Sequence, residues 1–179
     1  ISEMFKYKSL PAIQQEIDMM RENPDIYPKA IVELAETHYS KLEQKRKGDL
    51  AEFAIMRNKG TAGNVDLFYG NDPQQLKASF NEQFGLVSSH PDYKPGQTNL
   101  LTKVQTNDLV NFLSSDIGKV QKAQVAYNIV AAFGEESISI LNEIAPKDPV
   151  FARIGGLVME SPDARTVIDK IMTGQALID

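Results

Sequence analysis

The fold of this chain is decided by residues 115–134, which read SDIGKVQKAQVAYNIVAAFG. Ser115 or Asp116 can cap the start of a helix, because a short side-chain oxygen accepts hydrogen bonds from the free amides of the first turn. Apolar residues follow at helical spacing and cover most of the circumference over the last three turns. Gly134 can adopt the left-handed conformation in which many helices end. The stretch therefore predicts a buried helix surrounded by other helices.

The length and composition of the chain are those of a globular protein without disulfide bonds. Its 179 residues are enough for one domain, or for a domain with a helical extension. The absence of cysteine excludes disulfide bonds and cysteine-ligated metal sites. No signal peptide is recognisable, and no apolar run reaches the roughly 18 residues of a membrane span. Because the sequence begins at Ile1 rather than Met, we expect a trimmed, proteolysed or processed chain.

The net charge of −5 is unevenly distributed along the sequence. Residues 1–48 carry eight basic and eight acidic side chains, whereas residues 49–179 carry eleven and sixteen. A protein that binds nucleic acid needs a basic face to displace counterions, and an anionic membrane surface likewise attracts basic segments. The acidic main body therefore argues against nucleic acid and membranes as partners.

Residues 1–60 predict an N-terminal helical hairpin or extension. Helical spacing of apolar residues indicates a first helix over residues 10–22 and a second that ends near Gly48. Asp49 can then start a third, and one long helix through Gly48 is the alternative, at a cost of about 1 kcal/mol. The many charged residues indicate a hairpin that projects from the main body or packs loosely on it. The apolar stripe expected on the second helix consists of Ile31, Leu34, Ala35, His38 and Leu42.

Residues 71–179 predict a C-terminal helical bundle, separated from the hairpin by the glycine-rich loop 60–70. A short polar cap followed by proline, a common start of a helix, occurs at Asp72, Asp148 and Ser161. With the apolar periodicity, these signals predict helices over residues 73–84, 107–114, 117–133, 135–145, 149–159 and 162–173.

The fold class predicted for the whole chain is all-α, an irregular bundle of about eight helices with an N-terminal helical hairpin. The proline-containing residues 86–97 are expected to form an extended connection, with a short strand near residue 86 as an alternative. Gly155 and Gly156 lie inside a predicted helix with no strand before it. They therefore indicate close helix packing rather than a phosphate-binding loop.

The two histidines, His38 and His90, form no recognisable metal site. A zinc-hydrolase helix places two histidines four residues apart, and a di-iron bundle repeats a Glu-x-x-His motif. Neither spacing occurs around His38, which we interpret as a partly buried helical residue. The sequence predicts no metal ion and no cofactor.

Residues 133–137, FGEES, contain the one catalytic candidate of the chain. Lytic transglycosylases place a Glu-Ser pair at a helix end, with the glutamate as general acid in a cleft of low dielectric. Glu136 and Ser137 match that pair, but the glycine-rich turn and the glutamine that follow it in those enzymes are missing. We therefore expect no enzymatic activity, with Glu136 as a weak catalytic candidate.

Three aromatic residues in predicted loops, Phe68, Tyr69 and Tyr93, are candidates for partner binding. Exposed aromatic side chains often anchor a protein partner. The alternative is that they fill a crevice of this chain, as large apolar side chains more often do.

Several short motifs occur together in the C-terminal half: Leu100-Leu101-Thr102, Phe133-Gly134, IAPKDP at 144–149, IGGL at 154–157 and Gly174. With them, residues 98–178 resemble a segment of large structural proteins from tailed phages and prophages. Those are internal-virion or tail-associated polypeptides that often carry a lytic transglycosylase or peptidase domain elsewhere. The resemblance implies a virion or, for a prophage, the bacterial cytoplasm as the location. It also implies protein partners, either other virion proteins or the rest of a longer chain, and allows an oligomer.

Three functions follow from these observations. The first is a non-catalytic helical structural or assembly module of a larger phage or prophage virion protein. The second is a cell-wall glycan lytic enzyme that uses Glu136. The third is a bacterial adaptor that binds a partner through the loops 60–70 and 86–97.

Overall fold

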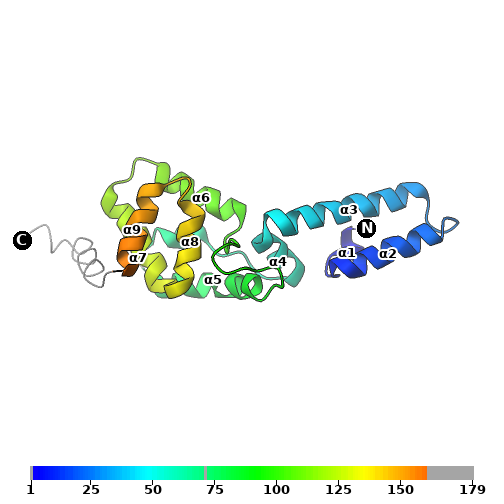
Figure 1. The fold of residues 1–179 in the computed structure, drawn as a ribbon, viewed down its shortest axis with the longest axis horizontal. Coiled ribbons are helices and arrows are strands. Elements are labelled where there is room, and N and C mark those ends of the chain that lie inside the picture. Colours follow the sequence, from blue (N-terminus) through cyan, green and yellow to red (C-terminus); the bar gives the residue numbers. More distant parts are fainter. Residues whose placement is uncertain (1, 71, 161–179) are drawn as a thin grey trace, which may run out of the picture.

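A computed structural model describes residues 2–70 and 72–160, which fold into an elongated all-α molecule (Figure 1). These residues form nine α-helices, eight of them longer than one turn, and no strand, so the predicted fold class is confirmed. The strand considered near residue 86 is absent because residue 86 lies within a helix, and the predicted helix 162–173 lies outside the described residues. The helices are α1 (Ser2–Phe5), α2 (Leu10–Glu22), α3 (Lys29–Gly48), α4 (Leu50–Asn58), α5 (Pro73–Ser88), α6 (Lys103–Ser114), α7 (Lys119–Phe133), α8 (Ser137–Ile144) and α9 (Pro149–Glu160), with short 3-10 helices η1 (Val65–Phe68) and η2 (Gly134–Glu136).

Helices α1, α2 and α3 form an arm that projects from one end of the molecule (Figure 1). Ser9 caps α2 by accepting a hydrogen bond from the amide of Ala12, and α2 then packs antiparallel to α3. An ion pair between Arg21 and Glu36, 2.8 Å apart, joins the two helices along one flank. The buried apolar side chains are Ile13, Ile17 and Met20 on α2 and Val32, Ala35 and Leu42 on α3.

The buried face of α3 differs in part from the predicted stripe. Ala35 and Leu42 are buried as expected, but Ile31 and Leu34 are 37% and 58% exposed, and Val32 is buried instead. Contact with a single helix covers only a narrow stripe of α3, so apolar residues beside that stripe stay in solvent. The prediction for Ile31 and Leu34 was wrong because it assumed a wider apolar contact.

Asp49 joins the arm to the bundle, because its side chain caps one helix and also contacts a second. The chain turns at Asp49 after α3, so the alternative of one long helix does not occur. Its Oδ1 accepts from the amide of Glu52 in the first turn of α4, and its Oδ2 accepts from the amide of Lys103 at the start of α6, each at 3.3 Å. One carboxylate therefore faces two helix N-termini, where negative charge is stabilised.

Helix α7 lies at the centre of the bundle, in contact with α5 and α9. The predicted cap at Ser115 or Asp116 was wrong. The amide of Ser115 donates to the carbonyls of Asn111 and Phe112, which ends α6, and α7 begins after Gly118 without a side-chain cap from either residue. Gly134 ends α7 with a positive φ of 56°. The predicted burial of its later turns is confirmed for Val125, Ala126, Ile129, Val130 and Ala132, whereas Ala131 is exposed.

Two buried glutamines connect the loop before α5, α5 itself and the start of α6. The side-chain amides of Gln83 and Gln105 donate to each other at 2.7 and 2.9 Å. Gln83 also accepts from the amide of Gly63 and donates to the carbonyl of Leu100, while Gln105 donates to the carbonyl of Gly63. Gln105 further accepts from the amide of Thr102, completing a capping box. Every hydrogen-bonding position of both amides is thereby used.

We expect Gln83→Ala to lower the free energy of unfolding by about 2–4 kcal/mol, because it leaves Gly63, Leu100 and Gln105 with unpaired buried polar groups. Urea denaturation of both proteins measures the change. Gln75→Ala is the control, since Gln75 lies exposed on the same helix. A loss for Gln83→Ala no larger than that for Gln75→Ala would contradict this prediction.

The predicted close helix packing holds for Gly155, where an added Cβ would lie 2.4 Å from a Leu141 methyl carbon. Gly156 has nothing within 4 Å of an added Cβ. We expect Gly155→Ala to destabilise the protein by about 1–3 kcal/mol through overpacking. Gly156→Ala, its matched control, should raise stability by up to about 1 kcal/mol through helix propensity. Thermal unfolding compares the two, and equal effects would show that α9 does not pack on α8 through Gly155.

Candidate functional site

The aromatic residues predicted to bind a partner are engaged inside the chain. Phe68 is fully buried with its ring 4.9 Å from that of Phe80, so the exposure that partner binding requires is not observed for it. The half-buried Tyr69 stacks on Phe112 with ring centroids 3.6 Å apart, and burial, then the charges of Asp66 and Asp108, raise its pKa. Tyr93 is half-buried against the core. Phe68 therefore fills the interior, which was the alternative considered, while partner binding by Tyr69 and Tyr93 stays a prediction.

The weak catalytic candidate, Glu136, lies exposed in η2 directly after α7. Its neighbours Gly134 and Glu135 are exposed as well, whereas Ser137 is buried and donates to the carbonyl of Gly134. A glycosidase general acid works in surroundings of low dielectric. The local geometry does not give Glu136 such surroundings.

The two histidines contribute to packing near the junction of arm and bundle. His38 lies against Phe5 with ring centroids 6.0 Å apart, and burial, together with nearby positive charge, lowers its pKa. His90 meets Phe53 edge to face at 5.9 Å, and its Nδ1 accepts from the amide of Asp92 at 3.1 Å. These contacts hold residues 90–92 beside α4.

Two cavities that share a wall lie at this junction. Arg46, at the end of α3, donates to the carboxylate of Asp92 and lies 3.8 Å from that of Glu43. Arg46, Pro91 and Asp92 line both cavities. We call the cavity on one side the basic groove and that on the other side the aromatic cavity. The ion pair of Arg46 and Asp92 therefore stands between them.

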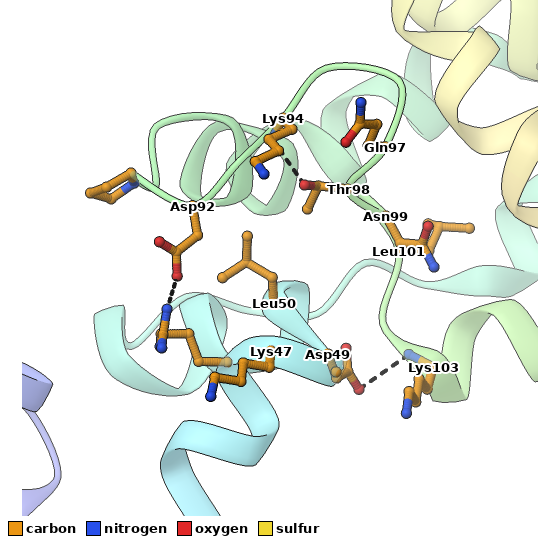
Figure 2. Close-up of a pocket in the computed structure, with 13 residues that line it drawn as sticks. Lys47, Asp49, Leu50, Asp92, Lys94, Gln97, Thr98, Asn99, Leu101 and Lys103 are labelled. Atoms are coloured by element: carbon orange, nitrogen blue, oxygen red, sulfur yellow. Dashed lines mark hydrogen bonds and ion pairs between the residues drawn. The ribbon is translucent and has the colours of Figure 1, made fainter.

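The basic groove has a volume of about 490 Å³ and is formed by the end of α3, the start of α4, residues 91–101 and Lys103 (Figure 2). Its carboxylates are already engaged, since Asp92 pairs with Arg46 and Asp49 accepts from two amides. In the described part of the chain, the ammonium groups of Lys94 and Lys103 have no carboxylate partner. The groove is therefore positively charged in a chain whose net charge is −5. Its lining is Arg46, Lys47, Gly48, Asp49, Leu50, Pro91, Asp92, Lys94, Gln97, Thr98, Asn99, Leu101 and Lys103.

The aromatic cavity is larger, about 710 Å³, and lies where the base of the arm meets α4 and residues 90–92. Arg57 on α4 spans this contact, because its Nη1 donates to the carbonyl of Phe5 and its guanidinium lies 5.8 Å from the centroid of the Phe53 ring. The lining is Tyr7, Lys8, Ser9, Leu10, Pro11, Gln14, Tyr39, Arg46, Phe53, Arg57, Asn58, His90, Pro91 and Asp92.

Sequence analysis did not identify Arg46 or Arg57 as site residues. Arg46 stands in the basic run that ends α3, which is typical of a solvated helix C-terminus. Arg57 stands near the end of α4, and no charged residue lies three or four positions away to mark it. Their shared site depends on residues 90–92, and no local pattern connects these segments.

One carboxyl group near the groove is buried. Glu143 on α8 accepts from the amide of Leu100, and burial raises its pKa to about 8, although the amides of Leu100 and Leu101 and the Thr106 hydroxyl oppose this shift. Its Oε2 and the Thr106 Oγ1 are both buried without a hydrogen bond of ordinary geometry. The surroundings therefore favour the protonated, neutral form of Glu143.

The chain matches no protein-family model, no curated protein and no solved structure. Within residues 2–70 and 72–160, no group of three or more histidine, aspartate or glutamate side chains is placed to hold a metal ion. None of the described helices combines the length and the apolar character needed to cross a bilayer.

We expect the free energy of unfolding to fall as the pH rises from about 4.5 to about 8. In this range Glu143 keeps its proton in the folded state and loses it on unfolding. The titration of Glu143 contributes at most about 1.4 kcal/mol per pH unit to the slope of the free energy of unfolding against pH. Glu143→Gln removes this titration and still accepts from Leu100, so it should raise the free energy of unfolding at pH 8 by about 1–3 kcal/mol and flatten the profile. Urea denaturation from pH 5 to pH 9 tests this, and an unchanged slope in the variant would contradict it.

Proposed function

We propose that this chain is a non-catalytic helical assembly module of a larger phage or prophage virion protein. The arm is the observation that carries the proposal. It projects from the bundle (Figure 1). It also keeps several large apolar side chains in solvent. Contiguous apolar surface that stays exposed is typical of protein–protein interaction sites. On α2, α3 and the turn between them, the exposed apolar residues are Met19 (43%), Ile26 (68%), Ile31 (37%) and Leu34 (58%), and Met4 (43%) and Tyr7 (49%) are exposed before α2.

Helical geometry places Met19, Ile31 and Leu34 on the same flank of the arm. The ion pair of Arg21 and Glu36 occupies one side of the contact between α2 and α3. Residues three or four apart share a helix face, so Ile31 and Leu34 form a stripe on α3, about 140–160° around the helix from Glu36. Met19 lies on the corresponding side of α2, away from Arg21. The arm therefore has one charged flank and one apolar flank.

The partner that fits the apolar flank is another helical protein chain. An apolar stripe at i and i+3 on an exposed helix packs into the groove of a partner helix. Other virion proteins, or the rest of a longer parent chain, supply such a surface, and the resemblance to phage structural proteins supports this choice. A virion, or the bacterial cytoplasm for a prophage product, is the location that this function requires.

The arm is expected to lose its partner when its apolar flank is charged. The partner is sought among the proteins encoded by neighbouring genes, as one that binds the wild-type chain. Ile31→Glu combined with Leu34→Glu should weaken this binding by more than about tenfold, because both new carboxylates would lose water at the interface. Thr37→Glu is the matched control, since Thr37 is exposed on the same helix. Sedimentation velocity on purified pairs measures the affinities.

Equal binding by the wild-type chain and the double variant would contradict the role of the arm. Coding sequence that continues beyond these residues, among genes for capsid and tail proteins, would support the virion assignment, and a setting of metabolic genes would oppose it. If the purified chain cleaved peptidoglycan and Glu136→Gln did not, the proposed assembly function would be wrong and the lytic alternative would hold.

A further inference from the structure

The aromatic cavity is built like a binding site for a small molecule. It is formed by segments far apart in the sequence: residues 7–14 of the arm, Tyr39 and Arg46 on α3, residues 53–58 on α4, and residues 90–92. Its volume of about 710 Å³ lies in the range of pockets for small ligands, which occur preferentially between structural units. The cavity is therefore large enough to enclose a ligand of one or two rings.

The apolar part of the lining consists largely of rings. Phe53 is nearly fully buried and contacts both His90 and Arg57, and Tyr39 is half-buried on α3. Leu10 and Pro11 lie at the start of α2 on the arm side. Such walls favour a flat apolar body, because aromatic rings bury a large area and prefer stacked or edge-on contacts.

The charged part of the lining is dominated by two guanidinium groups that are incompletely hydrogen-bonded. Nε of Arg46 and Nη2 of Arg57 are buried without an acceptor in the described part of the chain. Lys8, by contrast, pairs with Glu16. Burial also lowers the pKa of Arg57, as expected for a cation partly removed from water. Both of these atoms are closed to solvent, so an anion in the cavity would be attracted by the charge of the two guanidinium groups rather than by these two donors.

We infer that the aromatic cavity binds a small organic carboxylate with an apolar, preferably aromatic, body. The carboxylate approaches Arg57 and Arg46, whose planar groups match its two oxygens, and the body lies among Phe53, Tyr39 and Leu10. A cationic ligand is disfavoured, because Asp92, the one carboxylate in the lining, already pairs with Arg46. The basic groove on the other side of Arg46 has lysine, short polar and aliphatic side chains in its lining but, among the described residues, no aromatic ring on which such a body could stack.

Isothermal titration of the full chain with 2-naphthoate, and with the neutral 2-naphthalenemethanol as matched ligand, tests the inference. We expect the carboxylate to bind about tenfold more tightly than the alcohol, because only the carboxylate pairs with the guanidinium groups. Arg57→Gln should remove most of this preference, and Arg57→Lys should keep part of it. Arg153→Gln is the control, since Arg153 lies exposed on α9, outside the cavity lining.

Three results would overturn the inference. The two ligands could bind equally, Arg153→Gln could weaken binding as much as Arg57→Gln, or Lys94→Gln in the basic groove could abolish binding while Arg57→Gln does not. Circular dichroism checks that each variant is folded. If Arg57→Gln does not fold, Phe53→Leu replaces it, because it removes the ring without changing any charge and should weaken both ligands alike. The comparison of the two ligands on the wild-type chain needs no variant at all.

Discussion

The paired side chains of Gln83 and Gln105 are the contact on which the rest of the structure depends. An amide inside an apolar core is tolerated only when its donors and acceptors are satisfied, and these two satisfy each other and the backbone of three segments. They connect the loop at Gly63 and the turn at Leu100 to two helices of the bundle. Because the two loops carry no repeating hydrogen bonds of their own, this network specifies where they lie.

The turn at Leu100 links that network to the junction of arm and bundle. Its amide donates to the buried Glu143, and three residues later the chain enters α6, whose first amide donates to Asp49. Asp49 in turn ends the arm and starts α4. The position of the arm is thus determined by polar contacts at its base, and both cavities are products of that position. An assembly function through the arm and ligand binding at its base are compatible, since they use different surfaces of α3.

Predictions were correct where the physical signal acts between residues close in the sequence, and wrong where it depends on contacts between distant segments. Caps at Asp72 and Asp148 were predicted correctly, because the capping oxygen and the amides it accepts from lie within four residues. Ser115 has the same local chemistry, but the preceding helix uses its amide, which no local pattern reveals. Phe68 was predicted to lie in a loop, either exposed to a partner or filling a crevice of the chain, and packing against Phe80 gives the second outcome. The polarity of the neighbouring residues does not show whether a loop residue such as Phe68 is exposed or buried.

The sequence by itself determined that this protein is all-α, where most helices begin and end, and that α7 is buried, since helical periodicity and capping act within a few residues. Only the tertiary structure decided which apolar residues of α3 remain in solvent, that Gln83 and Gln105 meet, and that Arg46 and Arg57 line a common cavity. Those arrangements join segments separated by tens of residues. Their energies come from burial and from pairing across the fold, and neither exists until the chain has closed on itself.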